Sequence, residues 1–172
     1  LPGEGVHEVI IDSPSHSKSL AELSAEQARE LMAVYRERFQ AISTDLKVAL
    51  TMIFKNYGAA AGTSLEHPHS QLIGSSVVPS HIRHRMDEAQ KHFEQNGECV
   101  ICRMNEEESS QAERIIADTP DFTAYVLFAA LSPFHIWIVP KRHTPSFGDS
   151  TTAEADGLAD VLRTILKKIS GG

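Results

Sequence analysis

The sequence lacks the features of a nucleic-acid-binding or membrane protein. Its 172 residues carry 16 lysines and arginines against 23 acidic residues, and this net charge of −7 argues against a general binder of nucleic acids or anionic membranes. The longest apolar runs, such as AYVLFAAL at residues 124–131, are too short to cross a bilayer. No basic segment followed by an apolar core opens the chain, so we expect no secretory signal and a cytoplasmic location.

Cysteine is equally scarce. Cys99 and Cys102 are the only two, and they form one CxxC pair. A structural disulfide is not expected in a cytoplasmic chain, which leaves metal binding or redox chemistry. A thioredoxin-like CxxC follows a strand and opens a helix, whereas this pair follows a helical-looking segment and precedes the acidic RMNEEESS. Metal binding is therefore the favoured interpretation.

The remaining composition is that of a globular α+β protein with one or two domains, because 41% of the residues are hydrophobic and 23% are charged. Alternating apolar residues predict strands within residues 7–14, 46–56, 68–78, 113–118, 122–131 and 134–140. Helical periodicity predicts helices within residues 23–42, 80–96 and 151–169.

The first of these helices has the clearest signals. Ser24 with Gln27 three residues later is a capping box, and the apolar face of this amphipathic helix would be formed by Leu31, Val34, Phe39 and Ile42. Phe134 and Trp137 belong to the last predicted strand, and we expect both in the core and not in a ligand-binding platform.

One order of features occurs twice: a strand, a proline, a histidine and a capped helix. His16 marks the first copy and His143 the second, about 127 residues later. Repetition at this distance indicates a duplicated α+β unit and not an array of short repeats. We therefore expect residues 1–96 to be the C-terminal part of a first unit and residues 97–172 the N-terminal part of a second.

The segment GAAAGTSLEHPHSQLIG at residues 58–74 carries the strongest chemical signal. In a strand, His67, His69 and Gln71 would share one face, and Pro68 places the motif at a strand start or edge. Imidazole serves as metal ligand, base or nucleophile, and two imidazoles so close cannot both be charged without repulsion. The alternative interpretation is that both histidines are surface polar residues on a half-buried strand.

The residues just upstream favour a phosphate site over that alternative. The stretch from Asn56 to Ser64 is rich in glycine and alanine, so backbone N–H groups can approach a phosphate closely, and Ser64 adds a hydroxyl. A neutral histidine beside such a nest is a candidate nucleophile toward phosphorus, with Gln71 as a donor to a phosphoryl oxygen.

With these residues in place, FKNYGAAAGTSLEHPHSQ resembles the active-site segment of the galactose-1-phosphate uridylyltransferase family, within the histidine-triad superfamily. SPSHSKSLAEL resembles the segment ahead of it, and CVIC with SPFHIWIVPKRH resembles the second half-unit. The CxxC is similar to that of the ADP-sugar phosphorylase-like branch. The resemblance implies a histidine-triad-like fold of duplicated units, each with an antiparallel sheet and packed helices.

The resemblance also implies roles for individual residues. His69 would attack the α-phosphorus of a nucleotide sugar, forming a nucleotidyl-histidine and releasing a sugar 1-phosphate, and Gln71 would hold the phosphoryl group. The nucleotide and its phosphates would be contacted by Asn56, Gly62, Thr63 and Ser64.

Two zinc sites follow from the resemblance and the repeat. His67 would be a ligand together with His16 and a CxxC that would precede residue 1. Cys99, Cys102 and His143 would be three ligands of a second zinc, whose fourth ligand would follow residue 172. Four cysteine and histidine ligands form a closed, structural zinc site.

The implied activity is uridylyl transfer between UDP-glucose and galactose 1-phosphate, in galactose metabolism, by a homodimer. Two adenylyl-specific activities on the same scaffold stay open: ADP-sugar phosphorylase and diadenosine-tetraphosphate phosphorylase. A third alternative is a non-catalytic, zinc-stabilised fragment that binds nucleotides.

Overall fold

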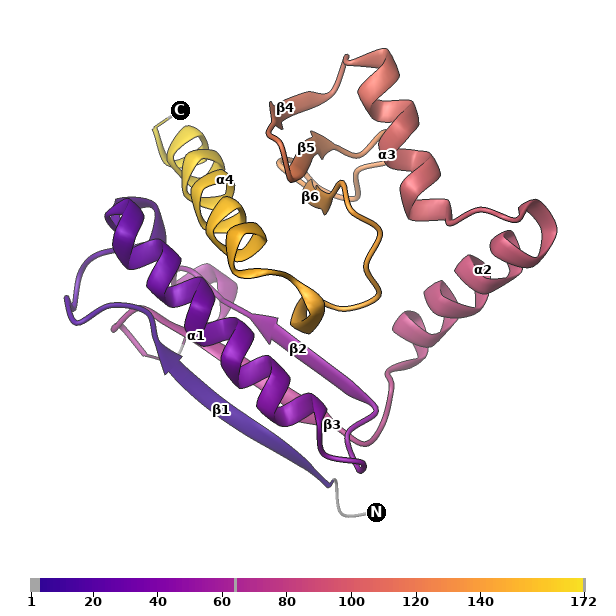
Figure 1. Cartoon of the computed structure of the whole chain (residues 1–172). Helices are drawn as coiled ribbons and strands as arrows, with labels where there is room; N and C mark the ends of the chain where they lie inside the picture. Colours follow the sequence, from indigo (N-terminus) through magenta and orange to yellow (C-terminus); the bar gives the residue numbers. More distant parts are fainter. Residues whose placement is uncertain (1–3, 64, 172) are drawn as a thin grey trace. The chain divides into compact units, whose positions relative to one another are not determined.

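The structure is a computed structural model that describes residues 4–63 and 65–171, and its contacts divide the chain into two units (Figure 1). Unit 1 is formed by residues 1–78 together with 146–172. Unit 2 is formed by Pro79–Pro145. None of the helices in the described part of the chain combines the length and the apolar character that a bilayer span needs.

Unit 1 contains an antiparallel three-stranded sheet in the order β1-β3-β2. Its strands are β1 (Gly5–Ile11), β2 (Leu50–Phe54) and β3 (His69–Ser75). Its α-helices are α1 (Ala25–Ser43) and α4 (Thr152–Ser170), and its short 3-10 helices are η1 (Leu20–Glu22), η2 (Ala59–Ala61) and η3 (Phe147–Asp149). These strands and α-helices confirm the predicted elements.

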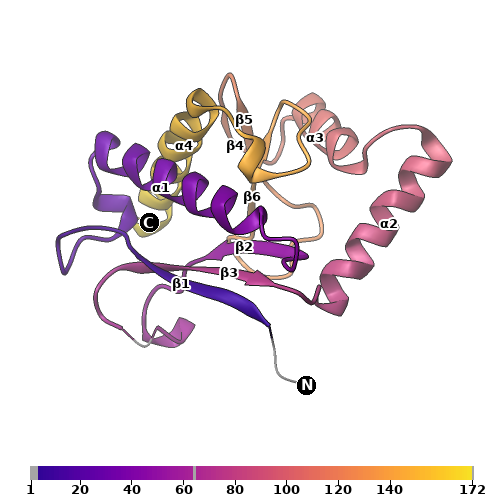
Figure 2. The same cartoon turned by 60° about the horizontal axis from the view of Figure 1, so that its bottom comes forward.

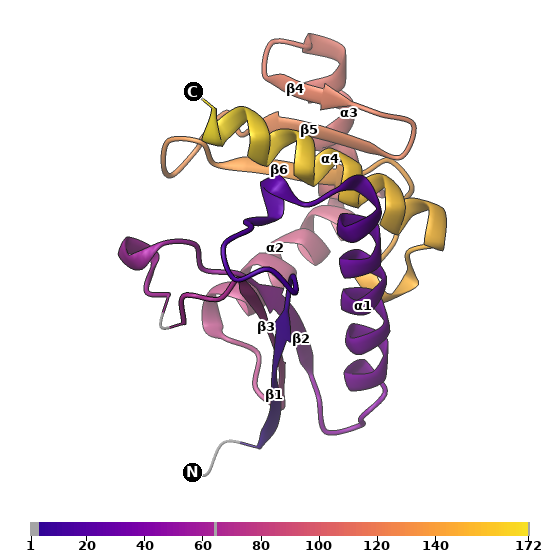
Figure 3. The same cartoon turned by 90° about the vertical axis from the view of Figure 1, so that its left-hand side faces the viewer.

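A capping box fixes where α1 begins, and a glycine in β3 lets the helix pack closely on the sheet. The Ser24 hydroxyl accepts from the Gln27 N–H at 3.1 Å, and the Gln27 side chain accepts from the Ser24 N–H at 3.1 Å, as the sequence predicted. A β-carbon on Gly74 would collide with the Ile42 side chain, so glycine at this position of β3 lets the helix lie close. Figure 3 shows α1 on one side of the sheet and the loop with η2 on the other.

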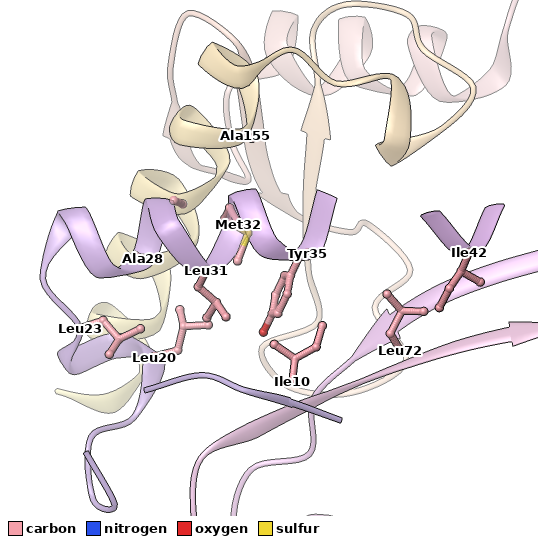
Figure 4. Packing of buried hydrophobic residues seen from close by; sticks show 11 residues of the cluster. Ile10, Leu20, Leu23, Ala28, Leu31, Met32, Tyr35, Ile42, Leu72 and Ala155 are labelled. Carbon is pink, nitrogen blue, oxygen red and sulfur yellow. The ribbon is translucent and has the colours of Figure 1, made fainter. Parts of the chain in front are cut away.

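The core of unit 1 lies between α1, the sheet, η1 and α4 (Figure 4). Leu31 and Ile42 of α1 are buried as predicted, and Leu72 of β3 is fully buried. Val34 was expected in the core and is 40% exposed, because the buried stripe of α1 continues through Tyr35 one residue later. The helix therefore turns a slightly different face inward than the apolar spacing alone suggested.

Unit 2 contains two helices and an antiparallel sheet in the order β4-β5-β6. The helices are α2 (Ser80–Asn96) and α3 (Val100–Gln111), and the strands are β4 (Ile115–Asp118), β5 (Phe122–Val126) and β6 (Ile136–Pro140). The sequence did not predict α3, because acidic and serine residues mask its periodicity. The core prediction for Phe134 is wrong: it lies in the turn before β6 with φ of 58° and is 74% exposed.

The compact units do not follow the expected boundary between residues 96 and 97. Two helices account for this: α2 belongs to unit 2, and α4 packs against α1 in unit 1 although the repeat in the sequence associates it with β6 (Figure 2). The division into two half-units of a duplication concerns the origin of the sequence and stays a prediction.

Candidate active site and metal-ligand clusters

His69 occupies the first position of the central strand β3, opposite Ile11 of β1. Its Nδ1 lies 2.9 Å from the backbone oxygen of His67, and because a carbonyl oxygen only accepts, Nδ1 is the donor. In a neutral imidazole the other ring nitrogen, Nε2, then carries the lone pair. His69 thus presents one fixed donor nitrogen and one nitrogen that can act as a base or nucleophile.

A pocket of about 370 Å³ is lined by His69, by the loop between β2 and β3, and by His16, Ser17 and Ser19 of the segment after β1. The lining includes Asn56 and Thr63, two of the predicted nucleotide-binding residues, together with Lys55. The Thr63 hydroxyl is buried and has no hydrogen-bond partner within residues 4–63 and 65–171. A buried hydroxyl without a partner is costly, so a ligand that supplied an acceptor or donor here would gain affinity.

Glycines shape the loop that forms this pocket. Gly58 and Gly62 flank η2 with φ angles of 82° and 79°, in the left-handed region that residues with a side chain rarely adopt. Gly58 lines the pocket, whereas Gly62 lies at the exposed end of η2 and is not in the lining. The predicted site residue Ser64 lies outside the described residues.

Gln71 shares the face of β3 that carries His69, two residues further along the strand. It does not line the pocket, and its side-chain oxygen accepts a hydrogen bond of 3.0 Å from Nε2 of His7 on β1. The structure therefore brings Asn56, Thr63 and His69 to one pocket and leaves Gln71 beside it on the sheet.

A buried polar cluster adjoins His69 from the side of the main chain. The carboxylate of Asp12, whose side chain is 1% exposed, accepts from Nζ of Lys55 at 2.6 Å. Lys55 also donates to the backbone oxygen of His69 at 2.9 Å. The other carboxylate oxygen accepts from the hydroxyls of Ser70 at 2.8 Å and Tyr35 at 3.1 Å, so both oxygens of the buried acid are satisfied.

The same cluster determines the protonation of Tyr35. Burial, and then the negative charge of Asp12, raise the pKa of the Tyr35 hydroxyl far above its usual range, so it stays a donor to the carboxylate. Sequence reasoning missed this cluster because its members come from four separate segments. Its one local signal is the polar Asp12 placed directly after an apolar strand.

His67 and His16 form a first candidate metal pair. Their Nδ1 atoms lie 3.2 Å apart, and Nε2 of His67 lies 2.7 Å from the backbone oxygen of Ser13. Because that oxygen can only accept, Nε2 of His67 is the protonated nitrogen and Nδ1 holds the lone pair directed at His16. A metal-binding histidine usually donates its other ring N–H to a carbonyl or carboxylate oxygen, so the pair fits a metal ion.

The second candidate metal cluster is formed by the CxxC pair and His143 in unit 2. The ligand atoms of Cys99, Cys102 and His143 all lie within 4.8 Å of one another, and Sγ of Cys102 is 3.2 Å from Nδ1 of His143. Both cysteines are free thiols. The CxxC does open a helix, α3, but it follows the helix α2 and not a strand, so the structure lacks the strand that precedes a thioredoxin-type motif.

The Cys102 thiol resists ionisation when no ion is bound. Burial, followed by the neighbouring Cys99 thiol, raises the pKa of Cys102. A bound divalent ion reverses this balance, because thiolates are the metal-binding form of cysteine. Two sulfurs and one nitrogen in this geometry are a donor set that can hold a metal ion.

Comparisons with known proteins identify relatives of this chain. The family model described as galactose-1-phosphate uridyl transferase, N-terminal domain, matches residues 2–79, the range that contains the pocket residues and the first metal pair. An ADP-glucose phosphorylase of Arabidopsis thaliana is 33% identical over 170 residues, which are 99% of this chain and 47% of the relative. A galactose-1-phosphate uridylyltransferase of Thermotoga maritima is 30% identical over 164 residues, which are 95% of this chain and 51% of the relative.

Solved structures agree with the sequence relatives. The crystal structure of an ADP-glucose phosphorylase from Arabidopsis thaliana with bound ADP-glucose matches with a TM-score of 0.87 at 32% identity, over 97% of this chain and 53% of that one. The chain spans about half the length of these relatives.

Proposed function

The chain belongs to the galactose-1-phosphate uridylyltransferase family, and from this membership we propose that it is a nucleotidyltransferase whose intermediate is covalently bound to His69. The observation that carries the proposal is the hydrogen bond from Nδ1 of His69 to the His67 carbonyl, beside the pocket that His69 lines. In the neutral ring this bond leaves the lone pair on Nε2, and it holds the ring in one orientation, as a nucleophile requires.

The reaction consists of two displacements at the α-phosphorus of a nucleotide sugar. In the first, Nε2 of His69 forms the N–P bond while the P–O bond to the sugar phosphate breaks, and the electron pair leaves on the sugar 1-phosphate. In the second, a phosphate oxygen of an acceptor attacks the phosphorus and the N–P electron pair returns to Nε2. The ring gains positive charge in the intermediate, and the Nδ1–H bond to the carbonyl stabilises that charge.

The pocket residues would hold the nucleotide during both steps. The unpartnered hydroxyl of Thr63 supports a contact with a phosphate or ribose oxygen, and the amide of Asn56 lines the same space. We extend this role to Gly62 and Ser64 on the resemblance alone. Gln71 would give up its bond with His7 to reach the phosphoryl group.

The nucleoside would lie on the apolar face of the sheet that carries His69. Register places Ile11 opposite His69 and Val9 opposite Gln71, so these side chains share that face. Val9 is 50% exposed and Ile11 57%, and Met52 of β2 is 40% exposed on the same face. A nucleobase laid here would cover apolar area that is otherwise in contact with water.

Two substrates follow from the relatives. Uridylyl transfer between UDP-glucose and galactose 1-phosphate is supported by the family model and the Thermotoga relative. Phosphorolysis of an ADP-sugar is supported by the Arabidopsis relative and its structure with ADP-glucose. Both use the same histidine chemistry and differ in the base and the acceptor.

The metal in both clusters is proposed to be zinc. Nitrogen and thiolate ligands with this spacing suit zinc, and the ligands would be His16 and His67 in unit 1 and Cys99, Cys102 and His143 in unit 2. With four cysteine and histidine ligands, the zinc ion in such a site would hold chain segments together and would not activate water. A homodimer and a cytoplasmic location are proposed from the resemblance and from the free thiols, respectively.

The proposal is tested by incubating the full chain with UDP-glucose or ADP-glucose radiolabelled at the α-phosphate, then counting acid-labile label on the denatured protein. We expect one of the two nucleotide sugars to label the wild-type protein. The variant His69→Asn should remain unlabelled and should keep its zinc content. The matched control is His81→Asn, an exposed histidine of α2, which should label like the wild type. Binding of nucleotide without any label would support the non-catalytic alternative instead.

A further inference from the structure

We propose that Lys55, paired with the buried Asp12, is a positioning residue that holds the backbone of the nucleophile His69 in its reactive place. This inference rests on the proposed function of His69. It adds to that function a buried ion pair that is not part of the ligand or nucleophile set described above.

The contacts of the pair surround the nucleophile along the main chain. Lys55 donates to the backbone oxygen of His69 at 2.9 Å and to Asp12 at 2.6 Å. The N–H of Asp12 donates to the backbone oxygen of Pro68 at 3.0 Å, and its carboxylate accepts from the Ser70 hydroxyl at 2.8 Å. The residues immediately before and after His69, and His69 itself, are therefore each bonded to one member of the pair.

Together with the imidazole bond to His67, these contacts leave the ring of His69 little freedom. The imidazole is fixed at Nδ1, and the backbone that carries it is fixed at its carbonyl. A displacement at phosphorus depends on the alignment of the attacking nitrogen with the leaving oxygen, and a misplacement of about 1 Å can lower a rate by about 100-fold. Loss of the pair should therefore act on the rate of the covalent step.

The burial and the ion pair of Lys55 favour a positioning role for this lysine over a role as a phosphate ligand. Lys55 is the one lysine or arginine among the described residues that line the pocket, and its side chain is 20% exposed. Two of the three N–H groups of its ammonium are already donated to the Asp12 carboxylate and the His69 carbonyl, and the Asp12 carboxylate balances its charge. If Lys55 were a phosphate ligand, its removal would weaken binding of the nucleotide sugar, whereas a positioning residue changes the maximal rate.

The test measures single-turnover labelling of His69 over a range of nucleotide-sugar concentrations, which gives a maximal rate and a half-saturating concentration. We expect Lys55→Met to lower the maximal rate by about 100-fold while the half-saturating concentration stays within about threefold. Asp12→Asn should lower the same rate, and the double variant Asp12→Asn/Lys55→Met should be no slower than Lys55→Met, because the two residues act as one unit.

The controls keep the inference falsifiable. Lys47→Met removes an exposed lysine of unit 1, 4.0 Å from Glu4, and should label like the wild type. If Lys55→Met fails to fold because a buried carboxylate loses its cation, the double variant, which removes both charges, supplies the rate.

Three results would overturn the inference: wild-type labelling by the Lys55 variants, a loss confined to the half-saturating concentration, or independent, multiplying losses for Lys55 and Asp12. Failure of the proposed function gives a different pattern, in which neither the wild type nor Lys47→Met acquires label. In that case both the proposed function of His69 and the positioning role of Lys55 are wrong.

Discussion

Nδ1 of His16 and Nδ1 of His67 lie 3.2 Å apart, although they come from segments 51 residues apart in the chain. Two nitrogens bound to one tetrahedral zinc, each about 2.0–2.1 Å from the ion, would be separated by about 3.3–3.4 Å. The histidine rings therefore already have the spacing of two neighbouring ligands on one ion. The nucleophile candidate His69 is two residues from one of them and uses its own Nδ1 differently, as a donor to a backbone oxygen.

The two metal clusters should lose their ions independently. We expect Cys99→Ser to remove zinc from the unit 2 cluster and His67→Ala to remove it from the unit 1 pair, each by about one ion per chain, because the ligand sets share no residue. Metal analysis of the purified variants measures this, with His81→Ala as the control. Zinc content that is unchanged in Cys99→Ser would show that the CxxC pair holds no ion.

The core of unit 1 should depend strongly on Leu72. This side chain is fully buried beneath α1, so Leu72→Ala should lower the free energy of unfolding by about 2–5 kcal/mol through lost burial and the cavity left behind. Denaturant unfolding followed by circular dichroism measures the change. The matched control is Leu46→Ala, at a fully exposed position, for which a change beyond about 0.5 kcal/mol would contradict this assignment of the core.

Because its hydroxyl is buried, Tyr35 should make the free energy of unfolding decrease as the pH rises into the strongly alkaline range. Its folded-state pKa is raised by burial and by Asp12, so the folded protein retains a proton that the unfolded chain releases above pH 10. Stability from this group is complete below the unfolded pKa and falls as pH rises above it, by up to about 1.4 kcal/mol per pH unit. Unfolding free energies measured across this alkaline range should fall more steeply for the wild type than for Tyr35→Phe; parallel slopes would contradict the prediction.

Local rules predicted most of the fold, because its signals lie within short segments. The capping box at Ser24 and Gln27 sets the start of α1, and Pro68 sets the start of β3 at His69. The helix α3 was missed since its acidic residues lack a clear apolar period. Phe134 was misassigned because the predicted strand was extended back to residue 134. In the structure this residue lies in a turn and has a positive φ.

The candidate site was predictable only where one segment supplies it. The motif from Asn56 to Gln71 predicted the pocket loop and the histidines, and the repeat predicted that His143 meets the CxxC. The contacts of Asp12 with Tyr35 and Lys55 depend on how α1 and two strands come together, which no local pattern encodes. Likewise, α4 packs against α1. The repeat in the sequence associates α4 with β6 instead, so it could not predict this contact.

The cysteines and His143 lie at opposite ends of a stretch that contains all three strands of unit 2. Cys102 and His143 are 41 residues apart, and β4, β5 and β6 all fall between them. An ion shared by these residues would act as a clasp that closes this long loop, and closing it restricts the unfolded chain more than the folded one. Removal of the ion by a chelator would then destabilise unit 2 first. Unit 1, which carries His69, has its own hydrophobic core and would stay folded.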